Sequence, residues 1–100
     1  MPLPDRYPQR RRVPWRTLDT EALVVDVSAG TLYPLNSVAA RIWALCDGAR
    51  SVDEIVRTLT SEFDADETLI RRDAEQFIAD LTTARLVEIG TGPAASQGDA

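Results

Sequence analysis

The sequence predicts an α+β domain in which helices pack on one side of a small antiparallel sheet. Short segments rich in valine and threonine occupy residues 13–35, and apolar residues recur at helical spacing between residues 37 and 84. The predicted strands come first along the chain, so the helices that follow have to cover one face of their sheet. We therefore expect two or three strands, then three helices and an optional last strand.

The chain has 100 residues, which is enough for one small domain. Residues 1–12 contain three prolines and end in three consecutive arginines, and we expect them to form a flexible arm. A solvated tail is the favoured interpretation of these arginines, and an anion or nucleic-acid contact is the alternative. The folded domain is expected over residues 13–89, and residues 90–100 have the composition of a disordered tail.

The composition makes several classes of function unfavourable. The chain has no histidine, no lysine and one cysteine, which removes the usual general base, Schiff-base chemistry and the common zinc ligand sets. The net charge of −5 argues against nucleic acid, because phosphate binding requires a basic face. No apolar run reaches the roughly 20 residues that span a bilayer, and no signal peptide is visible. We expect a cytoplasmic protein without enzymatic activity, cofactor or membrane partner.

The strand segments predict a hairpin with one exposed edge. Residues 22–28, "ALVVDVS", form a strand in which the face that carries Asp26 is expected to lie nearer water. A tight turn at Ala29 and Gly30 leads into a second strand over residues 31–35. Pro34 cannot donate a ladder hydrogen bond, so this second strand is expected at an edge. An edge strand over residues 13–18 is possible as well.

Local capping signals place the helices. Asn36 is suited to cap a helix over residues 37–46, and Gly48 to end it. Ser51 and Glu54 form a capping box for the next helix. A third helix is expected over residues 67–84, followed by a strand or an extended tail over residues 86–89. The apolar faces of the first and third helices are expected to contain Val38, Ala39, Ile42, Leu45 and Cys46, and Ile70, Ala74, Phe77, Ile78 and Leu81.

Candidate metal and catalytic groups have simpler structural explanations. Cys46 has no histidine partner and lies on an apolar helical stripe, so we expect a buried thiol. The tryptophans, Trp15 and Trp43, are expected in the core or at its boundary rather than on a ligand. Helix capping and solvated helix ends, rather than a calcium site or an acid–base pair, explain the acidic residues Asp47, Asp53, Asp64, Asp66, Glu67 and Asp73.

The remaining candidate is a peptide-binding surface. An exposed strand edge beside a helix can receive an extended peptide by strand addition, with alternate side chains entering the space between strand and helix. From the residues alone, the ordinary surface of a small helix is the favoured interpretation, and the peptide-binding surface is the alternative. The residues of the candidate peptide site are Thr31, Leu32, Tyr33, Pro34 and Leu35 on the strand, and Leu69, Arg72, Asp73 and Gln76 on the helix.

An ordered set of short motifs resembles the PqqD-like family, the precursor-peptide recognition elements of ribosomal natural-product pathways. The chain has an aromatic-containing strand that ends in Leu-Asn, a helix with Ile-Trp, and then Asp-Gly. A Ser-initiated helix with Glu-Ile follows, and then a helix with an aspartate and a Phe-aliphatic pair. These motifs are Tyr33, Leu35-Asn36, Ile42-Trp43, Asp47-Gly48, Ser51, Glu54-Ile55, Asp73 and Phe77-Ile78. The resemblance covers residues 18–89; Arg85 departs from it, because a glycine commonly stands there.

The resemblance implies a fold and a function. It implies a winged helix-turn-helix-like domain with a three-stranded sheet before three helices. It also implies a non-catalytic adaptor that binds the leader of a precursor peptide against the third strand and third helix. The partner would be a modifying enzyme such as a radical SAM protein, or a leader peptidase. The pathways implied are pyrroloquinoline quinone assembly, lasso peptides, whose discrete recognition proteins are the better match, or other modified peptides.

The alternative function is that of a winged-helix DNA-binding regulator. A recognition helix requires basic residues, and the candidate pair is Arg71 and Arg72, which acidic residues flank.

Overall fold

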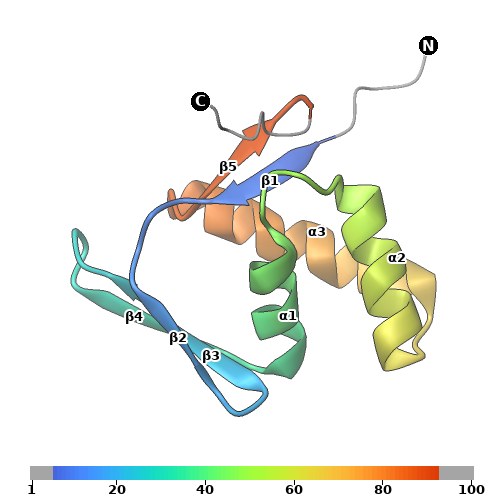
Figure 1. Ribbon diagram of the computed structural model, residues 1–100, viewed down its shortest axis with the longest axis horizontal. Coiled ribbons are helices and arrows are strands. Elements are labelled where there is room, and N and C mark those ends of the chain that lie inside the picture. The colour runs from blue at the N-terminus through green and yellow to red at the C-terminus, as the bar shows by residue number, and fades with distance from the viewer. Residues whose placement is uncertain (1–5, 93–100) are drawn as a thin grey trace.

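The structure is a computed structural model that describes residues 6–92. Two small sheets flank a layer of three helices (Figure 1). The predicted order of strands followed by helices is confirmed, and one additional strand precedes it. The elements in chain order are β1 (Tyr7–Arg10), β2 (Trp15–Leu18), β3 (Glu21–Asp26), β4 (Thr31–Leu35), α1 (Ser37–Leu45), α2 (Val52–Phe63), α3 (Glu67–Thr83) and β5 (Val87–Gly90).

The larger sheet is antiparallel, with strand order β2-β3-β4. The predicted hairpin joins β3 to β4, with Val24 opposite Tyr33 in the register. Gly30 has a φ of 65° in its turn, a conformation that costs glycine little, and Asp26 Oδ1 accepts a hydrogen bond of 3.1 Å from the Ala29 N–H. The sheet therefore has two edges, β2 and β4.

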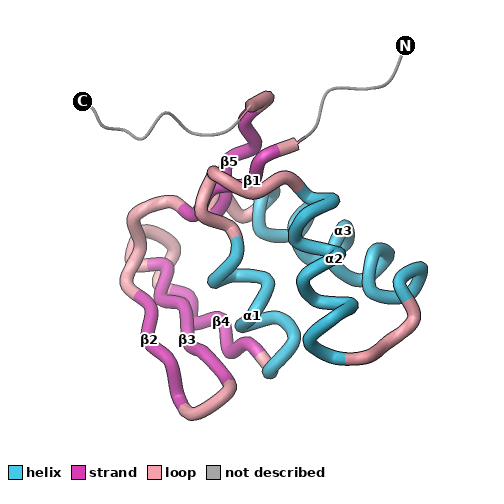
Figure 2. Tube along the Cα trace, turned by 45° about the vertical axis from the view of Figure 1, so that its right-hand side comes forward, coloured by secondary structure: helices cyan, strands magenta, loops and turns pink. Residues whose placement is uncertain are grey.

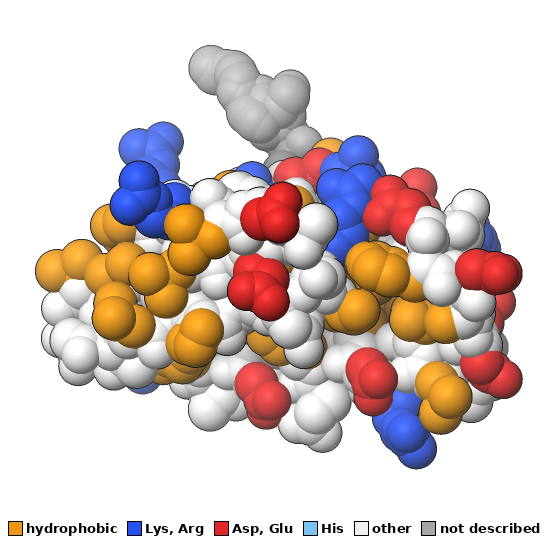
Figure 3. All heavy atoms as spheres, turned by 90° about the horizontal axis from the view of Figure 1, so that it is seen from below, with side chains coloured by type: hydrophobic (Ala, Val, Ile, Leu, Met, Phe, Trp, Pro, Cys, Tyr) orange, Lys and Arg blue, Asp and Glu red, His pale blue; other side chains and the backbone are white. Residues whose placement is uncertain are grey.

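The buried face of β3 differs from the prediction. Ala22 and Val24, on the same face as Asp26, are buried against the helices, whereas Val27 on the other face is exposed. Both faces of this strand carry aliphatic residues, so alternation alone gave the wrong assignment. The outer face of the sheet consequently remains apolar and uncovered within residues 6–92, and hydrophobic side chains gather over the sheet on the left of Figure 3.

The helices start where the capping residues predict. Asn36 Oδ1 accepts a hydrogen bond of 2.9 Å from the Ala39 N–H, and both hydrogen bonds of the capping box between Ser51 and Glu54 are present. After α1, Gly48 has a φ of 80°. The predicted stripe of α1 is rotated, since Trp43 and Ala40 are buried while Val38 and Ala39 pack only partly against the core. Trp43 is fully buried and is the largest side chain in the core.

The chain is a strand, not a flexible arm, over Tyr7–Arg10. This strand, β1, pairs antiparallel with β5, and the two lie together in Figures 1 and 2, apart from the larger sheet. Pro8 is fully buried, and the Arg10 guanidinium donates hydrogen bonds of 2.9 and 2.8 Å to the carbonyl oxygens of Trp43 and Ala44. These contacts hold the segment against the end of α1.

At the other end of the chain, the strand alternative for the last segment is confirmed as β5, which includes Gly90. Residues 1–5 of the expected arm and 93–100 of the expected tail lie outside the described residues. Within the described part of the chain, no helix is long and apolar enough to cross a membrane.

Candidate peptide-binding site

The strand β4 lies at an edge of its sheet, as Pro34 predicts. In the order β2-β3-β4 it pairs with β3 on one side, and its other side has no strand partner within residues 6–92. The free side presents main-chain groups that another extended chain can pair with. Pro34 has no N–H, so the strand offers one donor fewer than its length implies.

The two faces of β4 have different environments. Leu32 is 60% exposed, and Pro34 is also exposed, on the outer face of the sheet. Tyr33 is half-buried against the core, and Leu35 is buried, opposite Ala22. Leu35 was predicted as a peptide contact, but its side chain is part of the core, so only its main chain is available to a peptide.

The predicted flank of α3 is exposed. Leu69 is 50% exposed at the start of the helix, and Arg72, Asp73 and Gln76 are exposed along it. The Gln76 amide donates a hydrogen bond of 3.0 Å to Asp80 Oδ1, whereas Arg72 and Asp73 form a loose ion pair at 4.0 Å. The helix α1 packs against both β4 and α3 and so connects the two halves of the candidate site.

Two further features of the region did not follow from the sequence. Phe77 was expected in the core, but it is only half-buried, so its ring is partly available on α3. A hollow of about 850 Å³ lies between the β3–β4 turn, the end of α3 and the link from β1 to β2. It combines segments that are far apart in sequence, and for that reason no local motif predicts it.

The acidic candidates have the structural roles that the sequence predicts. Asp66 Oδ1 accepts the Thr68 N–H at 2.7 Å as the N-cap of α3, and Asp64 ends α2 in a left-handed conformation. The Asp47 carboxylate accepts the Ala49 N–H at 2.9 Å. The Asp53 carboxylate binds Arg71 at 2.7 Å, and this hydrogen bond lowers the pKa of Asp53.

The basic pair that a DNA-binding helix would use is partly neutralised. Arg71 binds Asp53 at 2.7 Å and Glu67 at 3.4 Å, so one arginine of the pair already has two acidic partners. Arg72 is exposed but lies beside Asp73. This geometry does not favour phosphate binding by α3.

Cys46 follows α1 as its C-cap and is fully buried. Burial raises the pKa of its thiol to about 12, since the thiolate would lose its hydration. The thiol is therefore a small apolar group at neutral pH, as predicted.

We expect Cys46 to react with a disulfide reagent such as dithionitrobenzoate at pH 8 at least about 100-fold more slowly in the native protein than in guanidinium chloride, because only the thiolate reacts and the buried thiol is rarely ionised. The rate of absorbance change in the two solutions measures this. Equal rates would show that the thiol is accessible and would contradict its burial.

The comparison with protein-family models resolves the identity of the domain. Residues 21–87, more than half of the chain, match the model for "Coenzyme PQQ synthesis protein D (PqqD)". The chain belongs to the PqqD family. The match begins where β3 begins and ends on the first residue of β5, so β1 and β2 lie outside it.

Solved structures agree with this assignment to the PqqD family. TbiB1, in complex with the TbiA(beta) leader peptide, is 27% identical with a TM-score of 0.72, over 80% of this chain and 94% of that one. The PqqD truncation of PqqCD from Methylobacterium extorquens, described as a functional and stand-alone recognition element, is 25% identical with a TM-score of 0.66. That match covers 81% of this chain and 87% of that one. A search of curated proteins found no match.

Proposed function

We propose that this PqqD-family protein is a non-catalytic adaptor for a ribosomally made precursor peptide. It binds the leader region of that peptide as an added strand on β4 and presents it to a modifying enzyme, such as a radical SAM protein, or to a leader peptidase. The free edge of β4 carries the proposal, because a structurally similar protein of the same fold is known with a leader peptide bound.

Each part of the site has a physical role in this proposal. The main chain of β4 supplies hydrogen bonds that are independent of the peptide's side chains, and these give affinity. Tyr33 and Leu69 supply apolar contact surface, while Arg72, Asp73 and Gln76 supply polar contacts on α3. Since β4 is already ordered by its pairing with β3, binding needs little reorganisation of the protein.

Hydrogen exchange tests the strand addition. A synthetic peptide that covers the leader half of a short precursor gene next to this chain's gene is added to the protein. We expect slower exchange in residues 31–35 and unchanged exchange in residues 15–18 of β2, the other edge of the same sheet. Protection of β2 alone would assign the peptide to the wrong edge and refute the proposed site.

Replacement of Leu69 by aspartate is expected to weaken leader binding about tenfold or more, since it places a charge where an apolar anchor binds and a loss of about 1.4 kcal/mol is tenfold. The matched control is Leu18→Asp, because Leu18 is 52% exposed, close to the exposure of Leu69, but lies on β2. Fluorescence polarisation gives both affinities. Equal losses of affinity in the two variants would show that Leu69 is not part of the peptide site.

A further inference from the structure

The turn after α3 holds an arginine in an unfavourable backbone conformation. The φ of Arg85 is 63°, in the left-handed region. The Arg85 N–H donates to the Thr82 carbonyl at 3.0 Å and the Leu86 N–H to the Leu81 carbonyl at 2.9 Å, which is the hydrogen-bond pattern of a Schellman motif. This position in the motif favours glycine. The other non-glycine residues with positive φ in residues 6–92 are aspartates, which tolerate this region better than arginine does.

Helix electrostatics alone do not explain an arginine at this position. A cation near the last turn of a helix does interact favourably with the exposed carbonyl groups. However, the last turn of α3 contains no basic residue, although Thr82 and Thr83 stand there in ordinary helical conformation. A basic residue at either position would supply the same interaction without the left-handed backbone. The interaction with the helix end therefore does not require an arginine at the left-handed position.

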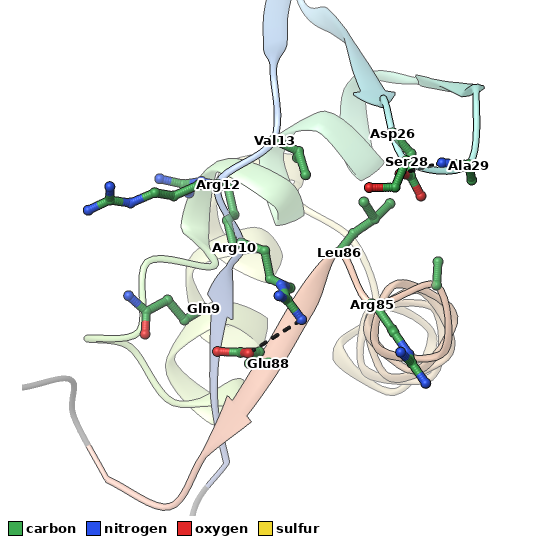
Figure 4. Close-up of a pocket in the computed structure, with 12 residues that line it drawn as sticks. Gln9, Arg10, Arg12, Val13, Asp26, Ser28, Ala29, Arg85, Leu86 and Glu88 are labelled. Carbon is green, nitrogen blue, oxygen red and sulfur yellow. Dashed lines mark hydrogen bonds and ion pairs between the residues drawn. The ribbon is translucent and has the colours of Figure 1, made fainter.

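Arg85 lines the hollow of about 850 Å³ beside the β3–β4 turn. In Figure 4, Arg85 and Leu86 stand below the turn that carries Ser28 and Ala29, and the Arg85 side chain points down from there; Arg12 lies on the opposite side, with its side chain directed away from the turn. The turn leads directly into Thr31, so the hollow adjoins the Thr31 end of β4. No residue of β4 itself lines the hollow, but a peptide that follows the free edge of β4 and continues past Thr31 leaves the sheet at the end where the hollow lies.

The hollow is basic although the chain as a whole is acidic. Its lining contains four arginines and two carboxylates, in a protein with a net charge of −5. Arg10 is held by the carbonyl groups at the end of α1, and Arg11 is 3.5 Å from Glu88. The Asp26 carboxylate accepts the Ala29 N–H within the turn. Within residues 6–92, Arg12 and Arg85 have no ion-pair partner.

We propose that Arg85 binds an aspartate or glutamate side chain of the leader peptide, in the segment that leaves β4 at its Thr31 end. A guanidinium group can bind a carboxylate through two parallel hydrogen bonds, so this contact selects for an acid at one position. The inference rests on the proposed function and specifies which leaders the site accepts.

The test uses the full chain, the Arg85→Gly variant and the synthetic leader-half peptide. Glycine suits the left-handed turn, so we expect the melting temperature of the variant to be unchanged or higher. We expect its affinity for the peptide to be about three- to tenfold lower, the range for a partly exposed charged hydrogen bond. The matched control is Arg57→Ala, which removes the same charge from an exposed position on α2 and is expected to leave affinity within about twofold.

A second peptide, with its acidic residues changed to the corresponding amides, closes a double-mutant cycle. The amide peptide should bind the native protein more weakly and should show no further loss with Arg85→Gly. The same loss with both peptides, or no loss with either, overturns this inference and leaves the proposed function intact. A lower melting temperature in the variant would assign Arg85 a structural role instead. No saturable binding of the native protein would overturn the proposed function together with this inference.

Discussion

Trp43→Ala is expected to lower the free energy of unfolding by about 3–5 kcal/mol, the range for removal of a fully buried aromatic side chain. Trp43 is 0% exposed and lies where α1 meets the sheet and the other helices. Small domains have a total stability at the low end of about 5–15 kcal/mol, so the variant should be largely unfolded in mild denaturant. Urea denaturation followed by circular dichroism measures the difference.

The matched control is Trp15→Ala. Trp15 is 39% exposed and meets Trp43 edge-to-face with a ring separation of 6.1 Å. The alanine variant loses that contact and a cation–π contact with Arg10, so its free energy of unfolding is expected to fall by about 1–2 kcal/mol. If the two variants were equally stable, Trp43 would not be the centre of the core. Trp43→Phe should cost less than Trp43→Ala, because the buried Trp43 Nε1 has no hydrogen-bond partner to lose among residues 6–92.

Removal of residues 1–12 is expected to destabilise the domain by at least about 3 kcal/mol, because several hydrogen bonds worth about 1 kcal/mol each are lost. The truncated chain lacks β1, the buried Pro8, and the Arg10 side chain that binds two carbonyl groups at the end of α1. It also lacks the main-chain bonds from the N–H groups of Gly48 and Val52 to this segment. Chemical denaturation of both chains at pH 7 measures the loss.

Point variants show whether the loss of stability comes from the contacts of β1 or from the shorter chain. Arg10→Ala should reproduce a large part of the loss, whereas Arg12→Ala, at an exposed neighbour, should leave stability nearly unchanged. A truncated chain as stable as the full one would restore the interpretation of residues 1–12 as an arm.

The cost of truncation should also depend on pH. The hydrogen bond from Arg6 lowers the pKa of Glu75. A lowered folded-state pKa adds stability above the unfolded-state pKa of the glutamate, and that stability is lost as pH falls through the lowered value. The difference in the free energy of unfolding between the full and the truncated chain should therefore become smaller at acidic pH.

Local signals in the sequence account for most of the fold. The caps at Asn36 and Ser51, the hairpin turn at Gly30 and the edge position of Pro34 each depend on neighbouring residues, and each prediction is confirmed. The buried face of β3 was not predictable in this way, because Leu23 and Val25 are as apolar as Ala22 and Val24. The face of β3 against which the helices pack becomes the buried one, and that packing depends on the whole fold.

Long-range pairing accounts for the remaining differences. The segment that forms β1 lies within residues 1–12, which are rich in proline and arginine, and its partner β5 is about eighty residues later. Nothing in either four-residue segment specifies the other, so a loose arm was the natural expectation. The basic hollow is likewise assembled from distant segments, and Arg85 belongs to it only because α3 ends beside the β3–β4 turn.

The central claim is that this domain recognises a leader peptide, and a fluorescence-polarisation titration tests it most directly. The two probes are the leader and core halves of any short precursor gene found beside this chain's gene, each labelled and titrated with the protein. We expect saturable binding of the leader half that unlabelled leader competes away, and no binding of the core half. If no leader encoded nearby binds, or if the core half binds equally well, leader recognition is contradicted, and a gel shift with duplex DNA at low salt becomes the next experiment.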